Sequence, residues 1–166
     1  MKLSIIIPVF NEIECIKEFT NNLNNTFINE NVEYIFIDDG SNDGSKEWLE
    51  EYIKKQPKEN NKFISLSKNI GKGNALHEGI KISKGDYILF QDADLELDTK
   101  DSLEMYKIIK NDNKINCLFG SRYLTGKLKS NKNYFNEFVG KLNSFIFNIL
   151  FSKSLSDVHC GAKIIS

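Results

Sequence analysis

The chain of 166 residues has 40% hydrophobic residues, 27% charged residues and a formal net charge of −1. A chain of this length buries enough surface for a hydrophobic core without disulfides or a structural metal, and this composition excludes intrinsic disorder, collagen and a disulfide scaffold. The near-zero net charge argues against nucleic acid as a partner, because phosphate binding needs a concentrated basic surface.

Short apolar runs alternate with longer amphipathic segments along the whole chain. The apolar runs predict buried strands at 3–9, 34–37, 63–66, 87–90 and 117–119. Helical spacing of apolar residues predicts helices at 12–23, 45–53 (capped by Asn42 or Asp43), 73–82, 103–109 and 136–151. This alternation predicts an α/β fold, with an open, mostly parallel sheet and helices on both faces.

Cysteine usage and hydropathy limit the class of protein further. The three cysteines are widely spaced and form no CxxC pair, which indicates reduced intracellular thiols and argues against a zinc site. The apolar start of the chain is too short for a signal peptide, and no run reaches the roughly 18 residues of a membrane-spanning helix. Residues 145–151 indicate a buried or interfacial helix face at most.

Polar and acidic clusters follow four of the predicted strands. They are Asn11-Glu12, Asp38-Asp39-Gly40-Ser41, Asp92-Ala93-Asp94 and Gly120-Ser121-Arg122. Ligands of open α/β sheets bind beyond the carboxyl ends of the strands. We therefore expect one ligand site at an acidic edge of the sheet.

Asp92 and Asp94 directly follow the apolar run 87–90. At a strand-to-turn junction both carboxylates can reach one divalent ion such as Mg²⁺ or Mn²⁺, which would bridge a diphosphate. Helix caps or a solvated turn are the alternative. The position favours a cation site, because two acids at the end of a buried strand are costly unless something cationic satisfies them.

The segment 38–45 is a turn by composition, and its Asn and Asp residues suit the cap of the next helix. Capping does not explain why two carboxylates, Asp38 and Asp39, lie side by side at the strand end. Hydrogen bonding to a nucleoside base or ribose, or an indirect metal contact, would explain them.

The segment 68–75 (KNIGKGNA) is similar to a phosphate-cradling loop in front of a helix N-terminus, although it lacks the GK[ST] ending of a Walker A motif. A plain glycine turn is the alternative. Beside an acidic metal edge, Lys68 and Lys72 become candidate diphosphate contacts.

The segment 157–163 (DVHCGAK) places a carboxylate on a short loop after the last predicted helix. Asp157 would be a general base for an acceptor hydroxyl or phosphate oxygen, or a helix cap, and spacing does not decide between them. His159 has a suitable pKa for acid–base chemistry, but a partly buried turn histidine is the alternative.

Six motifs occur in order along the chain: PVFNE from Pro8, DDGS from Asp38, NIGKG from Asn69, QDADLE from Gln91, GSRY from Gly120 and DVHCG from Asp157. Together they resemble family 2 inverting glycosyltransferases, and more narrowly the dolichyl- or polyprenyl-phosphate hexosyltransferases similar to dolichol-phosphate mannose synthase. The resemblance implies a GT-A fold, a nucleotide-diphosphate sugar donor (GDP- or UDP-sugar), a polyprenyl-phosphate acceptor and Mg²⁺ or Mn²⁺.

The resemblance also implies roles for matching positions. With the glycine loop, the candidate donor-binding residues are Pro8, Phe10, Glu12, Asp39, Lys68, Gly71, Lys72, Asp92 and Ala93. The candidate metal ligands are Asp92, Asp94 and Glu96. The candidate catalytic residues are Asp157, Asp92 and Arg122, the last a phosphate contact and the only arginine in the chain. A lipid phosphate acceptor is already anionic, so positioning matters more than a strong base.

The pattern departs from the family in two places. The mannose synthase branch has further arginines where this chain has Lys127, Lys129 and Lys132, which leaves the acceptor open. Family members continue past the closing motif into amphipathic or transmembrane helices. We therefore expect 1–166 to be one catalytic domain truncated at its C-terminal end, from a protein peripheral to the cytoplasmic face of a membrane.

Three alternatives accompany this hypothesis. A family 2 enzyme acting on a saccharide or cell-envelope glycan is one. A catalytically incomplete donor-binding domain is another. A sugar-phosphate nucleotidyltransferase fits poorly, because those enzymes have a Gly-rich loop directly after the first strand, where this chain has PVFNE.

Overall fold

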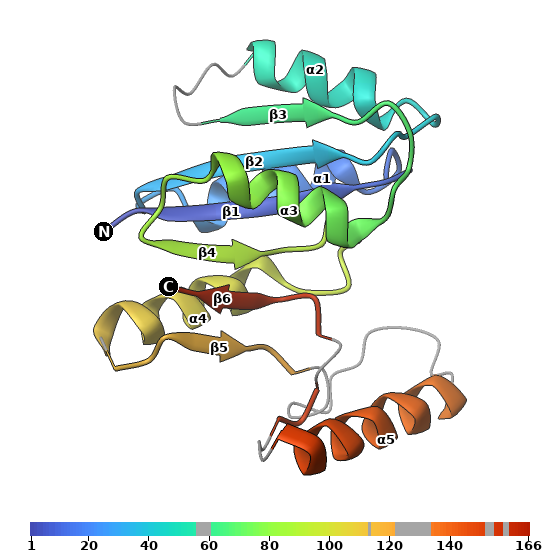
Figure 1. Ribbon diagram of the computed structural model, residues 1–166. Coiled ribbons are helices and arrows are strands. Elements are labelled where there is room, and N and C mark those ends of the chain that lie inside the picture. Colours follow the sequence, from blue (N-terminus) through green and yellow to red (C-terminus); the bar gives the residue numbers. More distant parts are fainter. Residues whose placement is uncertain (56–60, 113, 122–133, 152–154, 158–159) are drawn as a thin grey trace.

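The computed structural model describes residues 1–55, 61–112, 114–121, 134–151, 155–157 and 160–166 (Figure 1). Helices and strands alternate through most of this sequence. In chain order the elements are β1 (Leu3–Val9), α1 (Ile16–Thr26), β2 (Val32–Asp38), α2 (Ser45–Lys55), β3 (Lys62–Ser65), α3 (Lys72–Ile82), β4 (Tyr87–Phe90), α4 (Thr99–Asn111), β5 (Cys117–Phe119), α5 (Tyr134–Phe151) and β6 (Lys163–Ile165).

The described strands form one sheet in the order β3-β2-β1-β4-β6-β5 (Figure 1). The pairs β1–β2, β1–β4 and β2–β3 are parallel, and β1 pairs with β2 from Leu3 opposite Val32 to Val9 opposite Asp38. β6 runs antiparallel to both of its neighbours, β4 and β5. The predicted mostly parallel sheet is confirmed, whereas this antiparallel insertion was not predicted.

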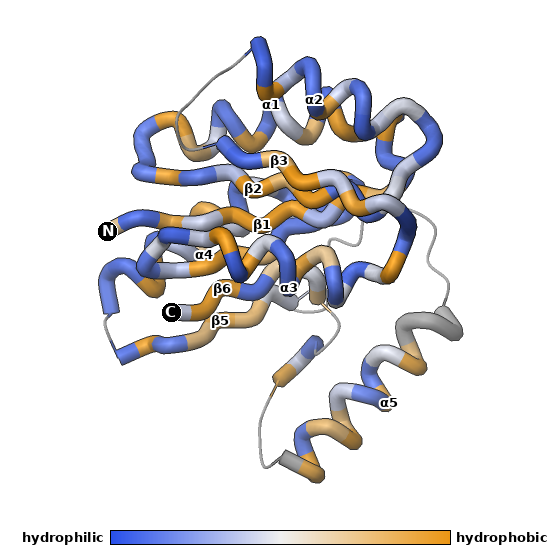
Figure 2. The backbone as a smooth tube through the Cα atoms, turned by 45° about the horizontal axis from the view of Figure 1, so that its top comes forward, coloured by the Kyte–Doolittle hydropathy of each residue, from blue (hydrophilic) through white to orange (hydrophobic). Residues whose placement is uncertain are grey.

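Helices cover both faces of the sheet, as the uninterrupted apolar runs predicted. Ile5 and Ile7 of β1 belong to a core shared with α1, α2 and α4, whereas Ile6 belongs to a smaller core with Ala75 of α3. Successive strand residues point to opposite faces, so the single run of β1 serves both cores. Figure 2 shows the strands as an apolar centre between helices that carry hydrophilic residues.

The predicted start of the first helix was wrong. α1 begins at Ile16, not at Glu12. The N–H groups of Glu12 and Ile13 instead donate to Ser45 Oγ (2.9 Å) and Asp43 Oδ2 (3.0 Å) of the β2–α2 connection. These long-range bonds hold the segment after β1 in a turn, and they position Glu12 at the end of the strand.

Of the two caps predicted for the second helix, Asn42 and Asp43, the structure shows Asp43, and the start predicted for the fourth helix was late. Asp43 Oδ1 accepts the N–H of Ser45, the first residue of α2, at 2.9 Å. α4 begins at Thr99 rather than at Leu103, because the side chain of Asp98 caps it by accepting the N–H of Lys100.

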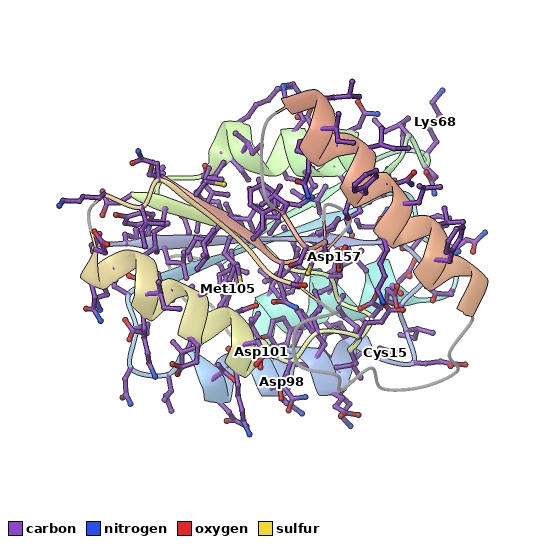
Figure 3. All side chains as sticks on the ribbon, turned by 90° about the horizontal axis from the view of Figure 1, so that it is seen from below. Cys15, Lys68, Asp98, Asp101, Met105 and Asp157 are labelled. Carbon is purple, nitrogen blue, oxygen red and sulfur yellow. The ribbon has the colours of Figure 1, made fainter. Side chains whose placement is uncertain are left out.

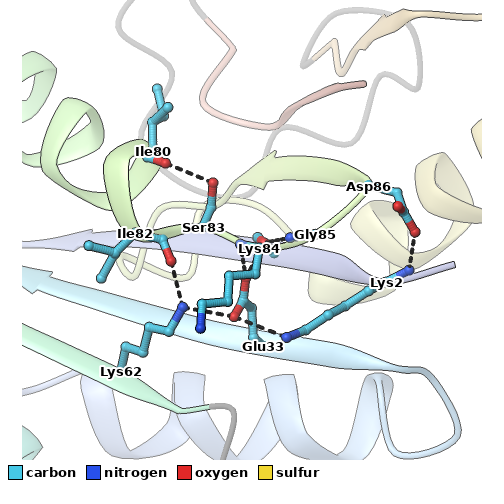
Figure 4. Close-up of polar contacts among 10 residues, drawn as sticks. Lys2, Glu33, Lys62, Ile80, Ile82, Ser83, Lys84, Gly85 and Asp86 are labelled. Carbon is cyan, nitrogen blue, oxygen red and sulfur yellow. Dashed lines mark hydrogen bonds and ion pairs between the residues drawn. The ribbon is translucent and has the colours of Figure 1, made fainter.

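A buried carboxylate joins three strands near their amino ends (Figure 4). Glu33 of β2 accepts hydrogen bonds from Ser4 Oγ (2.5 Å), the Lys84 N–H (2.5 Å), Lys62 Nζ (3.0 Å) and Lys2 Nζ (3.2 Å). Burial alone would raise its pKa, but these donors outweigh burial and lower the pKa of Glu33 to about 2. The cluster stabilises the sheet edge opposite the polar loops.

α5 lies apart from the sheet and exposes an apolar surface (Figures 1 and 2). Gly140 and Ser144 are on its buried side. We call the outward side the α5 apolar face, which consists of Phe138, Val139, Leu142, Phe145, Ile146, Ile149 and Leu150. Within the described residues, no helix has both the length and the hydropathy needed to span a bilayer.

Candidate active site

A cavity of about 270 Å³ opens at the carboxyl ends of β1, β2 and β4. Its wall consists of Pro8, Val9, Phe10, Glu12, Asp39, Asn69, Gly71, Lys72, Asp92, Ala93 and Asp94. The wall combines apolar and aromatic groups from the end of β1 with carboxylates from all three strand ends. The edge predicted from the sequence is therefore a real concavity, and the carboxylates face a common space.

Most of the predicted donor-binding and metal-binding residues line this cavity. Lys68 is exposed and Glu96 is exposed, and both lie outside the wall. Glu96 acts instead through its backbone, which donates an N–H to Asp94 Oδ1 at 3.0 Å. Arg122 and His159 lie outside the described residues. Direct roles for Lys68, Glu96 and Arg122 stay predictions.

Asp39 holds the loop that carries the glycine motif. Its two carboxylate oxygens accept the N–H groups of Ile70 (3.0 Å) and Gly71 (2.9 Å). Gly40, at φ +76°, allows this approach, because a Cβ there would lie 2.6 Å from the backbone of Lys68. The carboxylate of Asp39 thus positions the loop on the cavity, and its predicted contact with base or ribose stays a prediction.

The neighbouring Asp38 has a different set of partners. It is fully buried, and it accepts the N–H of Ser41 (3.1 Å) and the hydroxyl of Ser65 (3.0 Å). Internal hydrogen bonds therefore account for the pair of adjacent carboxylates that turn composition alone did not explain. Asp38 closes the turn after β2, and Asp39 anchors the loop before α3.

Asp92 lies between a lysine and a glycine. Lys72 Nζ, from the first turn of α3, is 2.5 Å from Asp92 Oδ1. On the other side Gly161 packs so closely that a Cβ at that position would lie 2.0 Å from Asp92 Oδ2. The antiparallel β6 brings Gly161 here, because it pairs directly with β4. Asp92 is therefore oriented from both sides.

Glu12 shows the charge imbalance of the cavity. Burial raises its pKa, and the nearby charges of Asp94, Asp43, Asp92 and Glu96 raise it further. A cation among these groups would relieve this repulsion. The local charge therefore suits a positively charged ligand.

The donor set fits a hard divalent cation with open positions. Asp92 and Asp94 supply carboxylate oxygens, which Mg²⁺ and Mn²⁺ prefer. No cluster of three or more acidic, histidine or cysteine side chains suited to a metal occurs in the described part of the chain. Mg²⁺ ordinarily binds through one or two carboxylates together with substrate phosphates, and Asp92 and Asp94 provide two carboxylates.

Asp157, the predicted base, is buried with 1% of its surface exposed. Figure 3 places it toward the centre of the molecule, whereas Lys68 lies at the outer margin. It follows α5 and precedes β6, and the described cavity wall does not include it. Its catalytic role stays a prediction.

Comparison with known proteins decides the family. The sequence profile described as Glycosyl transferase family 2 matches residues 4–166. The chain belongs to glycosyltransferase family 2. It is 32% identical over 173 residues to a dolichyl-phosphate beta-glucosyltransferase of Dictyostelium discoideum, a match that covers 98% of this chain and 53% of that protein.

Two further curated relatives of this family 2 glycosyltransferase are informative. A dolichol-phosphate mannosyltransferase of Pyrococcus furiosus is 32% identical over 85% of this chain and 39% of its own length. A poly(ribitol-phosphate) beta-glucosyltransferase of Bacillus spizizenii is 40% identical over 66% of this chain and 17% of its own length. The chain spans about half or less of the length of these relatives.

Solved structures confirm the predicted GT-A fold of this family 2 glycosyltransferase. The mannosyltransferase PcManGT from Pyrobaculum calidifontis, in complex with GDP-Man and Mn²⁺, superposes with a TM-score of 0.69 at 17% identity, over 98% of this chain and 44% of that one. TarS of S. aureus in complex with UDP gives a TM-score of 0.62 at 25% identity, over 79% of this chain and 38% of that one.

Sequence reasoning assigned no role to two cavity-lining residues of this family 2 member, nor to one residue that packs on the cavity. Val9 and Asn69 line the wall, and Gly161 packs on Asp92. All three residues lie within motifs quoted from the sequence, so membership of a motif was the available signal for them. No role was predicted for Gly161, because its contact with Asp92 depends on the pairing of β6 with β4, which local sequence does not encode.

Proposed function

We propose that this chain is the donor-binding and catalytic domain of a hexosyltransferase that moves a hexose from a nucleotide-diphosphate sugar to a polyprenyl phosphate, with inversion. The observation that carries the proposal is the cavity in which Asp92, Asp94 and Lys72 meet at the carboxyl edge of the sheet. Relatives named for dolichyl phosphate support the acceptor class.

The cavity wall divides into parts that suit different portions of a donor. Pro8 and Phe10, a residue that is 43% exposed, offer an apolar surface to a nucleoside base, and Glu12 and Asp39 offer acceptors to base or ribose hydroxyls. Lys72 would contact the diphosphate, and Asp92 and Ala93 would contact the ribose or sugar. The glycine loop brings the backbone of Gly71 close to the same region.

In the proposed reaction, an oxygen of the acceptor phosphate forms a bond to the anomeric carbon of the hexose. The bond from that carbon to the β-phosphate oxygen breaks, and the electron pair leaves with the nucleoside diphosphate. Attack from the face opposite the leaving group inverts the configuration. The acceptor is already anionic, so Asp157 would orient the acceptor and Arg122 would hold a phosphate.

Asp92 and Asp94, with Glu96 as a further candidate, would hold Mg²⁺ or Mn²⁺. When bound, such an ion neutralises the charge that develops on the departing diphosphate. Lys72 contributes a positive charge to the same phosphates, so a protein acid is not needed on the leaving group.

The α5 apolar face supports a lipid acceptor over a soluble one. Seven apolar side chains on one exposed helix face would be costly in water, and they suit the interface of a membrane that carries the polyprenyl chain. We accordingly propose that the protein works as a peripheral protein at the cytoplasmic membrane surface.

A glycan acceptor is the second candidate, and one observation favours it. The relative with 40% identity is named for poly(ribitol-phosphate), and its match covers two thirds of this chain. The two acceptors are distinguished by incubating the protein with Mn²⁺, a radiolabelled nucleotide sugar and either undecaprenyl phosphate or a soluble glycan. Only the polyprenyl-linked product would partition into organic solvent.

Donor binding is tested first with a panel of UDP- and GDP-sugars in Mn²⁺, followed by thermal unfolding. We expect one donor to raise the melting temperature of wild type. The increase in melting temperature that this donor causes should be much smaller for Asp94→Ala. If no donor shifts the melting temperature, and Asp94→Ala behaves as wild type, the proposal is wrong.

A further inference from the structure

Lys72 is the only cationic side chain among the cavity-lining residues that the structure describes. The same wall carries the carboxylates of Glu12, Asp39, Asp92 and Asp94. The ammonium of Lys72 lies 2.5 Å from Asp92 Oδ1, so it is the counter-ion of one of the two proposed metal-binding aspartates. One carboxylate oxygen that a metal would use is therefore already occupied by the chain itself.

The fold holds Lys72 in this place from its backbone. Lys72 is the first residue of α3, and the two residues before it donate their N–H groups to Asp39. The side chain of Asn74 also donates to the carbonyl of Ile70, at 2.6 Å, which closes the loop from the helix side. The loop thus fixes the backbone of Lys72 at the cavity wall, from which its side chain extends.

Asp92, the other member of the pair, is restricted by a close neighbour. Gly161 packs against its second oxygen, which limits how far the carboxylate can turn away from Lys72. The lysine side chain is half exposed, whereas that of Asp92 is 21% exposed, and a lysine stem has four rotatable carbons. When a ligand enters, Lys72 is therefore the partner that moves.

A free divalent cation and a diphosphate affect this pair in opposite ways. A cation alone must displace the ammonium from Asp92 and then lie beside it, so the two positive charges compete. A diphosphate supplies anionic oxygens to which Lys72 can transfer, and this transfer frees Asp92 for the metal. The same lysine thus opposes the metal alone and favours the metal with a nucleotide.

We infer that Lys72 makes metal binding depend on the donor, so that the divalent ion enters the cavity together with the nucleoside diphosphate rather than before it. The inference rests on the proposed function. Because coupling between two ligands is reciprocal, the metal and the nucleotide each raise the affinity of the other, and part of that coupling passes through Lys72.

The test uses Lys72→Met, which removes the charge and keeps the apolar stem, and measures Mn²⁺ affinity by calorimetry without nucleotide. We expect Lys72→Met to bind Mn²⁺ alone about two- to fivefold more tightly than wild type. With Mn²⁺ saturating, the same variant should bind UDP or GDP, whichever the donor panel identifies, about tenfold more weakly.

Two further variants control the result. Lys72→Arg keeps the charge and should retain the weak binding of Mn²⁺ alone. Lys81→Met removes a lysine of the same helix that pairs with Glu78 at 2.7 Å, and it should change neither affinity. A general effect of net charge would appear in Lys81→Met as well.

The outcomes separate the inference from the function on which it rests. Tighter Mn²⁺ binding together with weaker nucleotide binding in Lys72→Met supports the inference. If wild type binds Mn²⁺ with nucleotide, but Lys72→Met binds Mn²⁺ alone no more tightly, the inference is wrong and the proposed function stands. If wild type binds no nucleotide with Mn²⁺, both are wrong.

Discussion

Gly161→Ala tests the way in which the last strand builds the cavity. A Cβ at residue 161 would lie 2.0 Å from Asp92 Oδ2 and 2.8 Å from Asp92 Cγ, whereas ordinary contacts begin at 3.4 Å. The carboxylate must therefore retreat from residue 161 by more than about 1 Å, which changes the geometry of its contact with Lys72 on the other side. Overpacking of this kind costs about 1–3 kcal/mol of unfolding free energy.

A double-mutant cycle isolates this contact from other effects of the added methyl group. Urea unfolding of wild type, Gly161→Ala, Asp92→Ala and the double variant gives the coupling between the two positions. We expect Gly161→Ala to destabilise wild type and to have little effect once Asp92 is alanine. An equal cost in both backgrounds would refute the packing of Gly161 on Asp92.

The same substitution should affect activity more than stability. A displacement of about 1 Å in a group that positions the reacting atoms can reduce the rate about 100-fold. We therefore expect kcat/KM for the donor to fall by about that factor in Gly161→Ala, measured on folded protein. Activity equal to wild type would contradict the position assigned to Asp92.

Three more predictions follow from the contacts of individual residues. The pKa of Glu33 falls from an ordinary value of 4.5 to about 2, which corresponds to about 3 kcal/mol of stability for this buried group. That contribution is complete above about pH 5 and is lost as the pH falls toward 2. In urea unfolding, Glu33→Gln should therefore be about 3 kcal/mol less stable than wild type at pH 7, and this difference in unfolding free energy should become smaller in acid. Asp39→Ala leaves the N–H groups of Ile70 and Gly71 without their acceptor, so amide hydrogen exchange at these two residues should accelerate, and unchanged exchange would argue against the anchor. Replacing Phe145 with serine should weaken binding to vesicles that contain anionic lipid, measured by co-sedimentation, whereas equal binding would remove the α5 apolar face as support for a lipid acceptor.

Local sequence patterns were sufficient for the order and type of most elements. An apolar run that lacks alternation, as in β1, has to be buried on both faces, and this requires helices on both sides of a sheet. The position of acidic residues directly after such runs then placed Asp39, Asp92 and Asp94 at one edge, because the carboxyl ends of parallel strands meet there. The predicted edge is the cavity edge for this reason.

Local sequence patterns could not predict hydrogen bonds between residues that are distant in the chain. Asp39 accepts the N–H of Gly71, 32 residues away, and the turn that delays α1 depends on Asp43 and Ser45. Nothing in the composition of either segment names its partner. A carboxylate at a strand end is equally compatible with a ligand, a cap or a loop anchor until the neighbouring loop is in place.

The sequence by itself determined the α/β architecture, the acidic edge and the family motifs, since burial and periodicity are local properties of the chain. Only the tertiary structure decided that β6 lies antiparallel between β4 and β5. That pairing carries Gly161 against Asp92, while α3 brings Lys72 to the other side of the same carboxylate. Strand order is set by which apolar surfaces and backbone groups meet across the whole fold, so the state of Asp92 depends on contacts that its own segment of sequence does not contain.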